Sequence, residues 1–186
     1  MTREVLIFHG TAGNPKGNWF PWLKEKLEEK NCHVTVPRFP TPEGESLSSW
    51  LEVLKNHQDK ITAQTILIGH SKGGLFTLRV LEKLRKPVHA TFLVSAPIGI
   101  KPILYYKEDA AFSPGFKFDW ETIRKNSNQF TVYHSDTDPY VCLDNGKELS
   151  KKLGVNLQFI PNAGHLNAES GYTKFERLLK DVEKVL

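Results

Sequence analysis

The stretch Thr-Ile-Leu-Ile-Gly-His-Ser-Lys-Gly at residues 65–73 decides the fold of this 186-residue chain. Its first four residues are apolar or β-branched, and together they have the length of a buried parallel strand. The residues after the second glycine follow a helical pattern until Pro87 ends it. The leucines of that pattern recur three residues apart, at Leu75, Leu78, Leu81 and Leu84. The stretch therefore predicts a strand, a sharp turn and an amphipathic helix.

The turn carries a serine flanked two residues away by glycines, at Gly69, Ser71 and Gly73. Such a strand-to-helix turn is strained, and its close approaches leave no room for a Cβ atom at the glycine positions. The serine side chain is thereby pushed out above the sheet, as a nucleophile requires. Chance would produce this pattern about 0.06 times in a chain of this length. The alternative is a glycine-rich turn without chemistry, which the flanking strand and helix disfavour.

Length and cysteine content predict one soluble domain spanning residues 1–186, which would bury roughly 70% of its unfolded surface. The two cysteines, Cys32 and Cys142, lie far apart and outside any metal-ligand spacing, as expected in a reducing compartment. No apolar run approaches the roughly 18 residues of a membrane span, and only a few residues precede the first expected strand. We therefore expect a cytoplasmic protein without a signal peptide or a membrane partner.

The net charge of +4 does not predict nucleic-acid binding. Basic and acidic residues are interleaved across residues 24–30, which is typical of a solvated helix face. The most basic short stretch, at residues 83–86, lies at the expected end of a helix, where cations complement the helix dipole. We therefore expect no nucleic-acid partner.

Short apolar runs alternate with helical patterns along the chain, which predicts an α/β fold. Strands are expected at residues 5–8, 32–36, 65–68, 90–95, 129–134 and 157–160. Helices are expected at residues 19–30, after Ser46 or Ser48, after Gly73, and at residues 120–125, 141–153 and 172–185. The predicted fold has three layers, with about six parallel strands and helices on both faces of the sheet.

The segment at residues 97–120 interrupts this pattern. It has no clean periodicity but contains many apolar and aromatic residues. A loop of this length in a compact domain is usually functional or disordered, and this one is too aromatic for disorder. We expect a small lid or pocket-wall insertion that selects the substrate.

Two later loops supply an acid and a base. Asp136 and Asp138 follow the expected strand at 129–134, and His165 follows the last strand. With Ser71 they occur in the order nucleophile, acid, base, each after a strand, as an α/β-hydrolase triad requires. Pro139 favours Asp138 as the acid, because the residue before a proline is pushed into an extended conformation outside the following helix. Asp136 is expected to brace its loop through backbone N–H groups.

Five motifs extend this pattern over almost the whole chain: His9-Gly10-Thr11, residues 18–23, Gly69 to Gly73, Asp138-Pro139 with Val141, and Gly164-His165. They resemble the small serine hydrolases grouped around the retinoblastoma-binding serine hydrolase and the bacterial YdeN-like proteins. The resemblance implies a trimmed α/β-hydrolase fold and a triad of Ser71, Asp138 and His165, with no metal and no cofactor. Two residues depart from the usual pattern. Lys72 is expected to alter the pocket edge, and Cys142 stands where many hydrolases have proline.

The tetrahedral oxyanion of acyl transfer needs two fixed donors. One is expected from the backbone N–H of Lys72, and the other from Thr11 or Gly10 after the first strand. The candidate substrate-binding residues are His9, Trp19 and Asn167, although loop support is the simpler interpretation of His9 and helix packing that of Trp19. His70 is expected to pack under the turn, and His134 to end a strand.

These residues predict a serine hydrolase, of carboxylesterase type (EC 3.1) rather than peptidase type (EC 3.4), that acts on a small ester-like substrate through an acyl-enzyme. Thioesterases, amidases and peptidases use the same triad, and the fold does not choose among them. An alternative of another class is a non-catalytic interaction protein that binds a partner through residues 97–120. The sequence does not indicate a protein partner, and the intact triad argues against this alternative.

Overall fold

The computed structural model describes residues 2–186 and is built on one six-stranded sheet. The strands are β1 (Arg3–Phe8), β2 (Cys32–Thr35), β3 (Ile66–His70), β4 (Ala90–Val94), β5 (Phe130–His134) and β6 (Leu157–Phe159). Their order in the sheet is β2-β1-β3-β4-β5-β6, and every neighbouring pair is parallel. The predicted six parallel strands are therefore confirmed.

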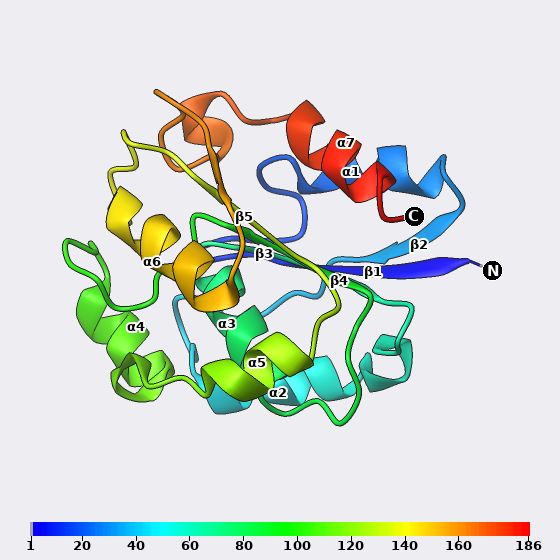
Figure 1. Ribbon diagram of the computed structural model, residues 1–186, viewed down its shortest axis with the longest axis horizontal. Helices are drawn as coiled ribbons and strands as arrows, with labels where there is room; N and C mark the ends of the chain where they lie inside the picture. The colour runs from blue at the N-terminus through cyan, green and yellow to red at the C-terminus, as the bar shows by residue number, and fades with distance from the viewer. Residues whose placement is uncertain (1) are drawn as a thin grey trace.

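Helices cover both faces of the sheet. They are α1 (Phe20–Glu28), α2 (Leu47–Lys55), α3 (Lys72–Leu81), α4 (Tyr106–Phe112), α5 (Trp120–Lys125), α6 (Leu143–Leu153) and α7 (Glu176–Glu183). Figure 1 shows α1 and α7 together on one side of the sheet, with α2, α3 and α5 on the other. The three-layer arrangement predicted from the sequence is confirmed. No helix within residues 2–186 is both long and apolar enough to cross a membrane.

Two apolar cores flank the sheet, because successive strand side chains point to opposite faces. In β1, Val5 and Ile7 join the core beneath α1 and α7, while Leu6 and Phe8 join the core beneath α2 and α3. All five residues of β3 and of β4 are buried. A central strand covered on both faces has no solvent side, which is why these two sequences are largely apolar, with Thr91 and His70 as the polar exceptions.

Four helices are shorter than predicted. The helix α1 covers Phe20–Glu28 rather than residues 19–30, because the chain leaves it in a turn that ends at Asn31, whose φ is 63°. The helix α3 ends at Leu81, and the next turn tightens, because Leu84 N–H donates to the Leu81 carbonyl. The helix α6 begins at Leu143, because Val141 pairs with Ile103 in an antiparallel bridge. The helix α7 begins at Glu176, because the chain before it forms turns in which the Tyr172 N–H donates to the Asn167 carbonyl and the Thr173 N–H to the Gly171 carbonyl.

The segment at residues 97–120 is largely packed rather than free. It contains the helix α4 and a short 3₁₀ turn at Pro114–Phe116, neither of which the sequence predicted. Its buried side chains Ile98 and Phe112 join the core on the α2 and α3 side of the sheet, and Ile103 is buried at the cavity. Leu104 and Tyr105 are exposed. Part of the segment therefore serves packing, and the remainder is free to border a cavity.

Candidate active site

Ser71 lies at the turn between β3 and α3 in a backbone conformation that non-glycine residues rarely adopt, with φ 56° and ψ −127°. Its N–H donates to the Val94 carbonyl at 2.8 Å, which ties the turn to the neighbouring strand. A Cβ atom on Gly73 would collide with the Phe8 carbonyl, and one on Gly69 would collide with the backbone of α3. Both glycines are thus required by close backbone approach, as the sequence indicated.

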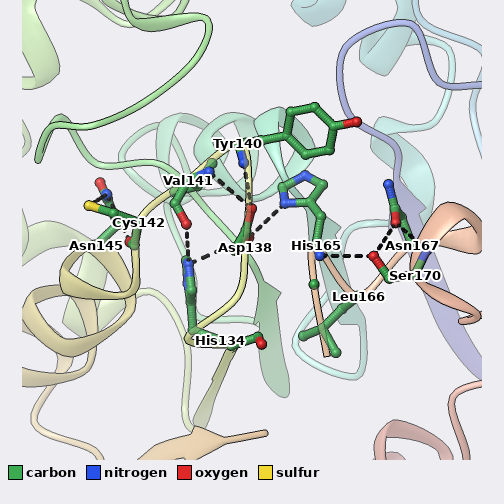
Figure 2. A network of polar contacts seen from close by, with 12 residues as sticks. His134, Asp138, Tyr140, Val141, Cys142, Asn145, His165, Leu166, Asn167 and Ser170 are labelled. Carbon is green, nitrogen blue, oxygen red and sulfur yellow. Dashed lines mark hydrogen bonds and ion pairs between the residues drawn. The ribbon is translucent and has the colours of Figure 1, made fainter. Parts of the chain in front are cut away.

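Asp138 and His165 meet from the loops that follow β5 and β6 (Figure 2). The His165 Nδ1–H donates to Asp138 Oδ2 at 2.7 Å. The other carboxylate oxygen accepts the N–H groups of Tyr140 and Val141, at 2.9 and 3.0 Å. Burial opposes the ionised form, but the His165 contact and these N–H groups outweigh it and lower the pKa of Asp138. An ionised Asp138 therefore favours, for the neutral His165 ring, the tautomer that carries its proton on Nδ1.

Asp136 occupies a different position. Its Oδ1 accepts the Asn162 N–H at 2.8 Å, and the residue is exposed. It braces the loop after β6 through a backbone N–H, whereas the sequence led us to expect that it would brace its own loop. Of the two carboxylates in this loop, Asp138 is the one that contacts His165.

Three neighbours hold His165 in place, and the sequence did not assign this role to any of them. Its N–H donates to Ser170 Oγ at 3.1 Å, and the Tyr140 ring packs against its imidazole at a centroid distance of 4.9 Å (Figure 2). The buried His70 donates Nε2–H to the His165 carbonyl at 2.9 Å. Burial, together with the nearby His165, lowers the pKa of His70 to about 3, so His70 stays neutral. No sequence spacing marks Ser170, which comes into reach only through the loop.

His134 supports the acid from behind. Its Nε2–H donates to the Val141 carbonyl at 2.8 Å and lies 3.6 Å from Asp138 Oδ2 (Figure 2). Burial lowers the pKa of His134, which favours the neutral ring. The strand-end residue predicted from the sequence therefore also fixes the loop that carries Asp138.

Ser71 and His165 line one cavity of about 270 Å³ at the carboxyl edge of the sheet. Within residues 2–186 no hydrogen bond joins Ser71 Oγ to the His165 ring, and catalytic bonds of this kind often tighten only when substrate binds. Loops after β1, β3, β5 and β6 and the segment 97–120 form the walls. The other lining residues are Gly10, Thr11, Ala12, Gly13, Asn18, His70, Ile103, Tyr105, Asp109, Tyr140, Val141, Asn167 and Glu169.

His9 orients the loop that follows β1. Its Nδ1–H donates to the Gly10 carbonyl at 3.0 Å, which also accepts the Gly13 N–H at 3.1 Å. In a trans peptide the C=O and N–H point in opposite directions, so the Thr11 N–H is directed away from His9. The other ring nitrogen accepts the Phe39 N–H at 3.0 Å. Since His9 is fully buried and does not line the cavity, its predicted contact with substrate is corrected to loop support.

Trp19 is also buried rather than exposed to the cavity. Its indole N–H donates to the Leu166 carbonyl at 3.0 Å, and its ring packs against Phe20 and Phe175. The prediction that Trp19 binds substrate is therefore replaced by its packing role. Asn167 does line the cavity, and its Oδ1 accepts a hydrogen bond from Ser170 Oγ at 2.9 Å.

The Lys72 side chain does not line the cavity itself and reaches it only through Asp109. It is 1% exposed and forms ion pairs with Glu45 and Asp109, of which Asp109 lines the cavity. Burial raises the pKa of Asp109 to about 6, although Lys72 opposes this shift. Cys142 N–H donates to the Pro102 carbonyl, a bond that a proline at this position could not make.

The described residues 2–186 contain no group of three or more histidine, cysteine, aspartate or glutamate side chains placed to hold a metal ion.

A serine on a strained turn after a central parallel strand, with an acid and a histidine after later strands, defines the α/β-hydrolase fold. The crystal structure of the ydeN gene product of Bacillus subtilis matches this structure with a TM-score of 0.91 and 26% identity, covering 99% of this chain and 98% of that one. The structure of Est1E from Butyrivibrio proteoclasticus with ferulic acid bound shares the fold alone, with a TM-score of 0.70, 15% identity, and coverage of 97% and 90%.

The chain belongs to the serine hydrolase family, whose model matches residues 5–184. It is 30% identical over 175 residues to the hydrolase YdeN of Bacillus subtilis (strain 168), which covers 93% of this chain and 90% of YdeN. It is 26% identical over 188 residues to the serine hydrolase RBBP9 of Rattus norvegicus, covering 98% and 95% of the two chains. The family resemblance read from the sequence motifs is confirmed.

Proposed function

We propose that this protein hydrolyses small ester-like substrates, with Ser71 as nucleophile, His165 as general base and Asp138 as the residue that orients His165. The observation that carries this proposal is the 2.7 Å hydrogen bond from His165 to Asp138 at the wall of the cavity that contains Ser71. A histidine held this way leaves Nε2 free to accept a proton.

The first half of the reaction forms an acyl-enzyme. His165 Nε2 takes the proton of Ser71 Oγ while the oxygen attacks the ester carbonyl. The resulting imidazolium lies against the Asp138 carboxylate, which stabilises its charge. When the tetrahedral intermediate collapses, the ester C–O bond breaks and the imidazolium gives its proton to the leaving alcohol.

The second half returns the enzyme to its starting state. His165 takes a proton from water as the water oxygen attacks the acyl carbonyl, and the proton then returns to Ser71 as the acid leaves. His70 supports both halves, because as a neutral donor to the His165 carbonyl it adds no positive charge beside the imidazolium.

The oxyanion is proposed to bind two backbone donors, the N–H groups of Lys72 and Thr11. Lys72 begins α3, where the first N–H groups have no partner within the helix and the helix dipole favours negative charge. The Gly10 carbonyl accepts hydrogen bonds from His9 and Gly13, and the Thr11 N–H of the same peptide points in the opposite direction. Removing one such donor in other hydrolases costs about 10² to 10³ in kcat.

The size of the cavity supports a small substrate. Its volume of about 270 Å³ lies just below the usual range of ligand sites, which is roughly 300 to 1,000 Å³. Its walls combine apolar side chains such as Ile103 with polar groups such as Asn167. We propose that a short acyl or alcohol group occupies this space, with Ile103 and Tyr105 of the 97–120 segment forming its wall.

A panel of p-nitrophenyl esters, with acyl chains of two to about eight carbons, tests the proposal. The native protein is expected to hydrolyse the short chains, and Ser71→Ala to lose this activity, since nucleophile loss in a comparable triad costs up to about 10⁶ in kcat. Thioesters and anilides with the same acyl groups show whether the protein prefers esters, thioesters or amides. Equal turnover by Ser71→Ala and the native protein would refute the proposed function.

A further inference from the structure

Lys72 carries a buried charge directly beside the nucleophile. Its Nζ atom forms ion pairs with Glu45 Oε1 and, at 3.1 Å, with Asp109 Oδ1. The side chains of the three residues are 1%, 11% and 5% exposed. Burying charges is costly even when they are paired, so such a cluster is weak evidence of added stability. Its connections to the cavity point to another role.

One arm of the cluster reaches the loop that follows β1. Glu45 Oε2 accepts the Thr41 hydroxyl at 2.5 Å, and Thr41 Oγ1 accepts the Ala12 N–H at 2.9 Å. Ala12 directly follows Thr11, whose N–H is the proposed second oxyanion donor. This chain of contacts therefore links the Lys72 side chain to the loop that carries the Thr11 N–H. The other proposed oxyanion donor is the backbone N–H of Lys72.

The other arm reaches the wall of the cavity. Asp109 lies in α4 and lines the cavity itself. The Lys72 ammonium also lies 5.5 Å from the centre of the Phe112 ring in the same helix, within the range of a cation–π contact. Two contacts therefore hold α4 against the first residue of α3. Their partners come from segments 37 and 40 residues away in sequence.

We propose that Lys72 is a positioning residue: its buried ammonium fixes the Thr11–Ala12 loop and the α4 wall relative to Ser71, and so sets the oxyanion hole and the substrate cavity together. This inference rests on the proposed function. The Glu45 arm governs the placement of a donor that acts in the transition state, and the Asp109 arm governs the shape of the substrate site.

The two arms predict different kinetic effects. Thr41→Val, which removes one hydroxyl at constant shape, and Glu45→Gln are each expected to lower kcat about tenfold with KM changed less than about twofold, because small displacements of a catalytic group cost up to about 10². Asp109→Asn is expected to alter KM and the ester chain-length preference more than kcat. Lys72→Met is expected to show both effects. Its matched control is Lys125→Met, which removes an exposed lysine paired with Glu121 on α5.

Titration of the active sites distinguishes a variant that is less active from one that is partly unfolded. Rates are expressed per site titrated with a fluorophosphonate, and thermal unfolding is followed by circular dichroism. If Lys72→Met does not fold, Thr41→Val and the double variant Lys72→Met with Glu45→Gln, which removes both charges of one ion pair, carry the test. Native kcat and KM per titrated site in these variants would overturn the inference and leave the cluster a structural role.

Amide hydrogen exchange tests the network without catalysis. The Ala12 amide is expected to exchange at least tenfold faster in Thr41→Val than in the native protein, and the same change is expected in Lys72→Met but not in Lys125→Met. Unchanged Ala12 exchange in the Lys72 variant would overturn the inference. If the native protein resists the fluorophosphonate while Ala12 exchange responds as expected, the proposed function fails and the link from Lys72 to the loop stands.

Discussion

The replacement of Asp138 by asparagine separates the two carboxylates of the acid loop. Asp138 Oδ2 accepts the His165 Nδ1–H at 2.7 Å, whereas Asp136 accepts a backbone N–H of the neighbouring loop. In Asp138→Asn the amide keeps the size of the carboxylate but loses its charge. Its NH₂ group also donates to Nδ1, which stabilises the tautomer whose Nε2 already carries a proton.

The expected loss follows from that change of tautomer. A comparable substitution in a serine protease triad lowers kcat by about 10⁴, which corresponds to about 5.4 kcal/mol at 1.36 kcal/mol for each tenfold change. Asp138 Oδ1 also holds the N–H groups of Tyr140 and Val141, and the asparagine oxygen can keep these bonds. We therefore expect a folded protein with its kcat reduced by about 10⁴.

The assay compares both variants on one p-nitrophenyl ester. Asp136→Asn removes a charge from the same loop without touching His165, so it is a matched control, and its kcat is expected to fall less than about tenfold. Circular dichroism verifies that both variants fold. A greater loss in Asp136→Asn than in Asp138→Asn would refute the assignment of the acid.

Three further predictions concern the cavity. Because burial raises the pKa of Asp109 to about 6, from about 3.9 in an unfolded chain, the folded state holds the proton more tightly. Raising the pH from 4 to 6.5 should therefore lower the free energy of unfolding by about 2 kcal/mol more in the native protein than in Asp109→Asn. The same pH dependence of the free energy of unfolding in both proteins, measured by urea denaturation, would contradict this. Tyr105→Ala should change the ester chain-length preference severalfold without slowing fluorophosphonate labelling, whereas an unchanged preference would assign Tyr105 to the surface alone. Asp109 and Glu169 are the acidic residues of the cavity lining and should repel a negatively charged substrate. At low salt a hemisuccinate ester should therefore show a KM about tenfold above that of its neutral methyl analogue, and the difference should be smaller in Glu169→Gln. Equal KM values for the two esters would show that the lining does not select by charge.

The sheet and the triad order were accessible from the sequence because each depends on local signals. Strands β3 and β4 are buried on both faces, so their sequences are largely apolar and do not alternate with polar residues. The turn at Ser71 needs glycines at fixed positions. The choice of Asp138 over Asp136 followed from the proline that comes after it, and the structure brings Asp138 to His165.

Contacts between segments far apart in the chain could not be predicted from local sequence signals. The burial of Lys72 depends on Glu45 and Asp109, which lie 27 and 37 residues away, so its sequence position alone suggested a pocket edge. Helix α4 has only seven residues, too few to show a clear period. Helix α6 begins two residues later than predicted, because Val141 pairs with Ile103 from the 97–120 segment.

The supporting histidines show the same limit. His9 and His70 stand beside the glycine and serine motifs, a position that suits either a ligand-binding residue or a buried one. Their role follows from their partners, which are the Gly10 carbonyl and Phe39 N–H for His9 and the His165 carbonyl for His70. Only the folded chain brings these groups together.

Labelling with a fluorophosphonate shows directly whether Ser71 is the nucleophile. The native protein is incubated with the probe, digested and mapped by mass spectrometry, beside Ser71→Ala and the control Ser150→Ala, whose serine is buried in α6. We expect one adduct, on Ser71, with equal labelling of Ser150→Ala and none of Ser71→Ala. An adduct on another serine, or a native protein that stays unlabelled while correctly folded, would contradict it.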